Sequence, residues 1–135
     1  MGALLADDKA WLRSALRLLL EHEANIEVHG EAGNARALAQ LMTILRPDLL
    51  FLDWQLPGLN TNETRQQLIQ SMRAAQPDLY IIALTTDENA QSCLRWGVDA
   101  SINKAEAPDR ILAVVRQAMS KLSKVSAIAQ SQRLL

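Results

Sequence analysis

The segment from Leu49 to Asp53, which reads LLFLD, decides the fold. Four consecutive apolar residues closed by an acid are typical of a short strand that is buried on both faces, as in a parallel sheet. A helical pattern from Ala35 to Leu45 precedes it and stops before Pro47, because a residue ahead of proline disfavours the helical conformation. Another helical pattern follows and closes before Pro77. The segment is therefore predicted to be a central strand with a helix on either side of it in the chain.

The same alternation of short apolar runs and helical spacing continues along the whole chain. Four further strands are predicted at Leu4–Ala6, Ile26–Glu31, Tyr80–Leu84 and Ala100–Asn103. Further helices are predicted after Asp8, from Asp87 to about Trp96, and from Pro108 onward. This alternation predicts an α/β fold with a five-stranded parallel sheet flanked by five helices. The strand order 2-1-3-4-5 is one of the two common orders of such sheets.

Composition indicates one soluble globular domain. The chain has 135 residues, of which 49% are hydrophobic and 21% charged, and its net charge is −1. With a net charge near zero, the protein has no overall electrostatic attraction for nucleic acid or an anionic membrane. The charged side chains after Asp109 are all basic. The single Cys93 allows no intramolecular disulfide and is expected to be a buried thiol. No apolar run reaches the roughly 18 residues that span a bilayer, so we expect a cytoplasmic protein without membrane contact.

Polar residues follow the predicted strands directly. They are Asp7, Asp8, Asp53, Thr85 and Lys104. Because functional residues of parallel sheets lie beyond the carboxyl ends of the strands, we expect these side chains to meet at one edge. Three neighbouring carboxylates repel each other unless a cation neutralises them, and oxygen ligands without His or Cys favour Mg²⁺. A carboxylate beside Mg²⁺ and an ammonium can attack a phosphoryl donor, which predicts a covalent aspartyl phosphate.

Four segments together resemble the receiver domain of bacterial two-component response regulators. They are Leu4–Asp8, Leu52–Gly58, Ala83–Thr85 and the single residue Lys104. The resemblance implies a flavodoxin-like (CheY-like) sheet. It also implies a receiver domain over residues 1–122, with residues 123–135 as a C-terminal tail or linker.

Within that family, the chain is most similar to receivers of the NarL/LuxR type. The segments LLADD (residues 4–8) and IEVHGEA (residues 26–32) carry this likeness. Receivers of this type usually precede a helix-turn-helix output domain. The likeness therefore implies that a full-length protein controls transcription.

The resemblance implies a role for each residue of the metal site. Asp8 would bind Mg²⁺ directly, and Asp7 would bind it directly or through water. Asp53 would contribute a carboxylate oxygen, and Gln55 would contribute its backbone carbonyl. Mg²⁺ is the one cofactor implied.

The phosphoryl group is implied to contact three side chains. Asp53 would be the phosphoacceptor, Thr85 would donate a hydrogen bond to the phosphoryl group, and Lys104 would pair with one of its oxygens. Two positions differ from the family pattern. Ser101 stands where the family usually has a Tyr or Phe whose rotation is coupled to the hydroxyl that contacts the phosphoryl group. Thr86 stands where a small residue is commoner.

The resemblance also implies the partners of the chain. A sensor histidine kinase would supply the phosphoryl group, and phosphorylation would favour a homodimer. The contact face is expected along the fourth helix, fifth strand and fifth helix, with the first and fifth helices as the alternative. This chain alone is expected to bind no specific nucleic acid. It is not expected to be an enzyme, beyond catalysing its own phosphorylation and dephosphorylation.

Three alternatives compete with this interpretation. Asp7 and Asp8 by themselves could cap a helix. An aspartate-nucleophile phosphatase of the haloacid dehalogenase type also uses a strand-end Asp and Mg²⁺, but it needs a second acid where this chain has Gln55. A receiver-like interaction module that works without phosphorylation is the remaining alternative.

Overall fold

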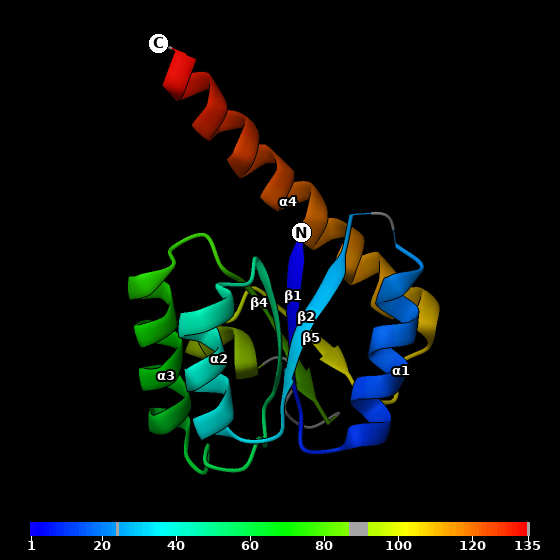
Figure 1. The fold of residues 1–135 in the computed structure, drawn as a ribbon. Helices are drawn as coiled ribbons and strands as arrows, with labels where there is room; N and C mark the ends of the chain where they lie inside the picture. Colours follow the sequence, from blue (N-terminus) through cyan, green and yellow to red (C-terminus); the bar gives the residue numbers. More distant parts are fainter. Residues whose placement is uncertain (24, 87–91, 135) are drawn as a thin grey trace.

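The computed structural model describes residues 1–23, 25–86 and 92–134, with side chains through residue 124. Five parallel strands form one sheet in the order β2-β1-β3-β4-β5, which confirms the predicted order. Figure 1 shows helices on both sides of this sheet. The strands are β1 Gly2–Ala6, β2 Glu27–Ala32, β3 Leu49–Asp53, β4 Tyr80–Thr85 and β5 Ala100–Asn103. Each bound lies within two residues of its prediction.

The helices differ from the prediction at one place. They are α1 Ala10–Glu21, α2 Ala35–Leu45, α3 Asn62–Ala75, the 3-10 helix η2 Ser92–Trp96, and α4 Pro108–Leu134. The described residues therefore contain four α-helices instead of five. The expected α-helix from Asp87 to Trp96 is a 3-10 helix from Ser92 onward, and residues 87–91 lie outside the described residues.

The hydrogen bond at the end of η2 is that of a 3-10 helix. The Gly97 N–H donates to the Leu94 carbonyl three residues back, which is the bond of a 3-10 turn. Gly97 itself has a φ of 105°, a left-handed conformation that glycine adopts without steric strain. Its expected place at the end of this helix is confirmed.

Local sequence explains where the longer helices begin and which faces they bury. The Asn34 side chain accepts a hydrogen bond from Ala37 N at 2.8 Å, which satisfies one of the free amides at the start of α2. In α1 the buried residues are Leu12, Leu16 and Leu20, spaced by four so that they share one face. The face that carries them packs against the sheet.

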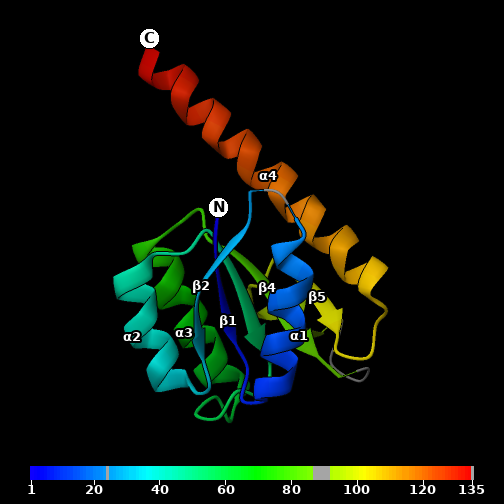
Figure 2. The same ribbon diagram turned by 45° about the vertical axis from the view of Figure 1, so that its right-hand side comes forward.

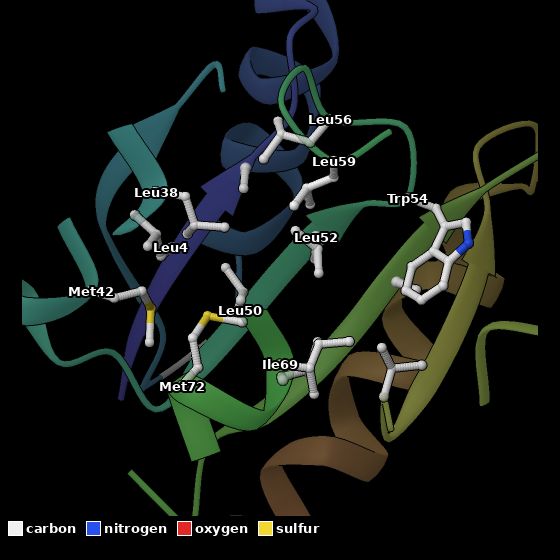
Figure 3. Close-up of a cluster of buried hydrophobic side chains, with 14 of the residues drawn as sticks. Leu4, Leu38, Met42, Leu50, Leu52, Trp54, Leu56, Leu59, Ile69 and Met72 are labelled. Carbon is white, nitrogen blue, oxygen red and sulfur yellow. The ribbon is translucent and has the colours of Figure 1, made fainter. Parts of the chain in front are cut away.

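The sheet separates two hydrophobic clusters, and β3 contributes to both. Leu50 and Leu52 point to the side that α2 and α3 cover, where they pack in the cluster drawn in Figure 3. Leu49 and Phe51 point to the other side, which α1 and the first part of α4 cover. Burial on both faces is the reason that this strand is apolar at four successive positions.

The last helix is longer than the sheet requires. Its 27 residues span about 40 Å. Figures 1 and 2 show that its final part projects away from the sheet. Residues 123–134, expected as part of a C-terminal tail or linker, continue the helix in the structure. Among the described residues no helix is long and apolar enough to cross a membrane.

Candidate functional site

The register of the sheet brings the predicted site residues to one edge. Ala6 of β1 pairs with Leu52 of β3, so Asp7 and Asp53 directly follow two paired residues. On the far side of β3, Thr85 of β4 pairs with Asn103 of β5, and Lys104 comes next along the chain. Parallel strands end at the same edge, and this places the acids and the lysine on neighbouring strand ends.

Three carboxylates form a cluster at this edge. Asp7, Asp8 and Asp53 each offer one oxygen, and these three oxygens lie within 4.8 Å of one another. Asp7 is fully buried and Asp53 is 2% exposed, whereas Asp8 is exposed. Carboxylates that lie this close together, two of them shielded from water, repel each other strongly unless positive charge offsets them.

Lys104 supplies positive charge to two of these acids. Its ammonium Nζ lies 2.9 Å from Asp7 Oδ2 and 3.0 Å from Asp53 Oδ1. The backbone N–H of Lys104 donates to the Thr85 carbonyl at 2.8 Å, which extends the pairing of β4 and β5 by one residue. The strand end therefore aims the side chain across the edge of the sheet toward β1 and β3.

Backbone amides hold the two buried carboxylates in place. Asp53 Oδ1 accepts from Gln55 N at 3.0 Å, and Asp7 Oδ1 accepts from Lys9 N at 2.8 Å. Asp7 therefore braces the turn that precedes α1. The residue at the cap position is Lys9, whose side chain makes no capping hydrogen bond. Capping alone therefore does not account for the pair of acids before this helix.

Burial and charge shift two pKa values in the cluster. Burial raises the pKa of Asp53, and the hydrogen bonds from Lys104 and Gln55, which lower it, do not cancel this effect. The nearby Asp7 charge adds to the increase. Burial by itself lowers the pKa of Lys104, but its contacts with Asp7 and Asp53 outweigh burial and raise that pKa. Lys104 is therefore positively charged at neutral pH.

The cluster fits a magnesium ion. Asp7 Oδ2 is buried and accepts no well-directed hydrogen bond from any described residue, although the Lys104 ammonium lies near it. Mg²⁺ binds oxygens at about 2.1 Å in an octahedron, so oxygens on opposite sides of the ion are about 4.2 Å apart. One oxygen from each of Asp7, Asp8 and Asp53 lies within 4.8 Å of the others, which is near enough for the three to surround one ion after small side-chain movements.

The other predicted site residues lie near the same edge of the sheet. Thr85 is buried, and its hydroxyl donates to the Ile102 carbonyl over a long 3.5 Å. Thr86 is exposed, so of the two threonines it is Thr85 that points into the protein. Gln55 is exposed and contributes its amide to Asp53, while the metal-binding role of its carbonyl stays a prediction. Ser101 is half-buried on β5.

A model of the response regulator receiver domain matches residues 3–116. The chain belongs to this receiver domain family. The match confirms the resemblance on which the site was predicted. It does not test the expected boundary at residue 122.

Similar proteins agree with the family. The receiver is 30% identical over 115 residues to the nitrate/nitrite response regulator NarL of Escherichia coli K12, a match that covers 85% of this chain and 53% of NarL. The chain thus spans about half the length of NarL, and 30% to 54% of the length of the curated relatives it matches.

Among solved structures, the receiver resembles the receiver domain of AraT from Geobacillus stearothermophilus. The two are 29% identical with a TM-score of 0.77, over 93% of this chain and 97% of that one. It also resembles RcsB from Salmonella enterica serovar Typhimurium, solved bound to promoter rprA in the presence of the phosphomimetic BeF3−. That match has 25% identity and a TM-score of 0.71, over 96% of this chain and 68% of RcsB.

Sequence reasoning missed one residue that contacts the site. The Arg13 side chain on α1 donates to the backbone carbonyl of Asp7, and it also pairs with Glu31 at the end of β2. Arg13 follows no strand, and in the sequence it reads as an ordinary polar position of an amphipathic helix. Only the packing of α1 against the ends of β1 and β2 shows its place beside the cluster.

Proposed function

We propose that this receiver accepts a phosphoryl group on Asp53 from a sensor histidine kinase of a two-component system, and that the new charge switches a protein contact. The observation that carries the proposal is the position of Lys104, whose ammonium lies within 3.0 Å of both buried carboxylates. A cation on two converging acids supports phosphoryl chemistry, because the negative charge of an incoming phosphoryl group needs the same compensation.

The two oxygens of Asp53 have different surroundings, which supports one of them as the nucleophile. Oδ1 accepts from Gln55 N and lies beside Lys104, whereas no described residue donates a hydrogen bond to Oδ2. Lone pairs on Oδ2 are therefore available for attack. In the transfer, the new bond joins Oδ2 to phosphorus, and the bond from phosphorus to the histidine nitrogen of the kinase breaks. The bond electrons leave with that nitrogen.

Each neighbour then has a defined task. Bound at the three acids, Mg²⁺ would offset charge on the phosphoryl oxygens. Asp7 and Asp8 would hold the ion, and Lys104 would pair with one phosphoryl oxygen. The Thr85 hydroxyl makes a long bond to the Ile102 carbonyl, so redirecting it to a phosphoryl oxygen would forfeit little. That movement is the proposed start of the conformational switch.

A phosphodonor experiment tests the proposal directly. We expect the chain to gain one phosphoryl group, measured by intact mass, on incubation with acetyl phosphate and Mg²⁺. Asp53→Asn should abolish the gain, whereas Asp78→Asn, which removes an exposed carboxylate outside the cluster, should leave it unchanged. If Asp53→Asn gained the group at the wild-type rate, the phosphoacceptor would be another residue.

The same experiment separates the proposal from its main alternative. A receiver-like module that works without phosphorylation would gain no mass with any phosphodonor. Amide exchange of the phosphorylated form then tests the switch. Thr85→Ala should accept the group but lose the change in exchange over the segment from Ser92 to Ser101.

We also propose that the switched contact is self-association, within a full-length protein that controls transcription. On α1, Trp11 is 68% exposed and Leu18 62% exposed, two turns apart on one face. This supports the face formed by the first and last helices over the expected face that includes β5. Sedimentation with and without beryllofluoride tests it, and a monomer in both states would point to a different partner. The chain alone is proposed to have no specific nucleic-acid contact.

A further inference from the structure

Arg13 links three parts of the fold beside the acidic cluster. From α1, its Nη1 donates to the Asp7 carbonyl at 2.5 Å, and its Nε donates to Glu31 Oε1 at 3.0 Å. The other oxygen of Glu31 accepts from Arg17 Nη2 at 2.9 Å. The Arg13 guanidinium is therefore fixed at both ends, between the end of β1 and the end of β2.

Arg13 completes the fixation of Asp7. The Asp7 amide donates to the Ala32 carbonyl at 2.9 Å, and Asp7 Oδ1 accepts from Lys9 N at 2.8 Å. Among the described residues, Arg13 is the donor that satisfies the Asp7 carbonyl. Three of the four polar atoms of Asp7 are thus held by hydrogen bonds, and Oδ2 faces the cluster beside the Lys104 ammonium.

Asp8 depends on the same contact, although Arg13 does not touch its side chain. The Asp8 carboxylate is exposed, and within the described part of the chain it has no hydrogen bond or ion pair. The Asp7 carbonyl and the Asp8 amide belong to one planar peptide unit. The hydrogen bond that holds the Asp7 carbonyl therefore also fixes the orientation of the peptide unit to which the Asp8 side chain is attached.

We propose that Arg13 is a positioning residue for divalent-cation binding, which holds the Asp7–Asp8 peptide so that both carboxylates face the cluster. The inference rests on the metal site of the proposed function, but it does not require phosphoryl transfer. The fork of the guanidinium matters here, because one side chain must reach the Asp7 carbonyl and the Glu31 carboxylate at the same time.

The positioning role predicts that loss of Arg13 weakens cation binding, whereas electrostatics alone predicts that it tightens binding. The direction of the change in cation affinity therefore distinguishes the two. A guanidinium beside an acidic cluster repels Mg²⁺, so removing its charge should tighten cation binding if charge were its only influence. If Arg13 acts by positioning, its loss should weaken binding even though a positive charge has been removed. A residue that only supports the fold would change stability and leave the cation affinity unchanged.

The experiment is a cation titration without any phosphodonor. Mg²⁺ binding is followed by Trp54 fluorescence in a Trp11→Phe, Trp96→Phe background, and Mn²⁺ binding by electron paramagnetic resonance, which needs no fluorescence response. Arg13→Gln and Arg13→Lys should both bind about tenfold more weakly, as is typical for partners that orient metal ligands. Arg17→Gln is the matched control and should keep the wild-type cation affinity. The substitution removes a contact with Glu31, but Arg17 does not contact Asp7.

Glu31→Gln provides an independent variant in which the Arg13 charge is kept. It should weaken cation binding, and combining it with Arg13→Gln should add less than the sum of the single effects, because both act on one contact. Far-ultraviolet circular dichroism establishes that each variant is folded. Unchanged or tighter binding by folded Arg13→Gln would overturn the proposal, as would wild-type affinity in Arg13→Lys. If the Arg13 variants bound Mg²⁺ and Mn²⁺ more weakly as expected, but the wild type could not be phosphorylated, only the proposed function would be refuted.

Discussion

Replacing Lys104 with methionine should destabilise the fold when no divalent cation is present. Lys104→Met keeps a long, unbranched side chain but removes the ammonium that lies 2.9 Å from Asp7 Oδ2 and 3.0 Å from Asp53 Oδ1. Both carboxylates are then left in a nearly dry site with no described cation in contact. Folding itself becomes less favourable, because the unfolded chain hydrates both charges.

The contact distances give the size of the effect. At an effective dielectric constant of about 20, each ion contact of about 3 Å corresponds to roughly 5.5 kcal/mol of gross attraction, most of which offsets the desolvation of the ions. Removing one partner of a buried ion pair costs about 3 to 5 kcal/mol. The Lys104 side chain is 20% exposed, so water partly screens these charges and reduces the loss of stability. The lower value, about 3 kcal/mol, is therefore expected.

Urea unfolding followed by tryptophan fluorescence measures this loss. A slope of about 1.5 to 2 kcal/mol per molar turns 3 kcal/mol into a fall of about 1.5 to 2 M in the midpoint. Mg²⁺ at about a hundred times its dissociation constant adds about 2.7 kcal/mol to a protein that binds it. Without the competing ammonium the variant should bind Mg²⁺ more tightly than the wild type, so the difference between their midpoints should narrow when the ion is added.

The matched control is Lys124→Met, which makes the same change of net charge at an exposed position of α4. Its midpoint should stay within experimental error of the wild type. An unchanged midpoint for Lys104→Met without Mg²⁺ would refute the reasoning, because the two carboxylates would then need no cation.

Three further results are expected. Because the pKa of Asp53 is raised in the fold, the metal-free wild type should gain stability relative to Asp53→Asn as the pH falls from neutral through that raised pKa; urea midpoints that move in parallel would contradict this. Cys93 is fully buried and its pKa is raised to about 11, so iodoacetamide at pH 8 should label the native protein far more slowly than the urea-unfolded one, as measured by mass. Asn34→Ala removes the side-chain bond to Ala37 N and should cost about 1 kcal/mol in thermal or urea unfolding, whereas Asn34→Asp should largely keep it.

Much of the fold could be predicted from local pattern. The run from Leu49 to Leu52 is apolar at every position because β3 is covered on both faces, and Pro108 and Gly97 mark helix ends through their backbone preferences. The segment after β4 was harder, because a five-residue helix has too few turns for its spacing to separate a 3-10 helix from an α-helix. Residues 123–134 carry only a weak pattern, yet they continue α4.

The sequence by itself determined which chemical groups end the strands. An acid directly after a buried apolar run is expected near the strand end, because burying a charge within a sheet is costly unless it is paired. The alternation of strands and helices then requires parallel strands, whose carboxyl ends share one edge. Asp7, Asp8 and Asp53 were identifiable for this reason and Lys104 by its place after the last strand, whereas the choice of Thr85 over Thr86 rested on the family resemblance.

Only the tertiary structure decided which of these groups touch and what holds them. The 2.9 Å and 3.0 Å contacts of Lys104 depend on the register of four strands, and a register cannot be derived from any one strand alone. The contact of Arg13 with the Asp7 carbonyl depends on how α1 packs across the ends of β1 and β2. Such contacts join backbone atoms to distant side chains, and a carbonyl is the same at every position of the chain, so no residue pattern marks which one will be bound.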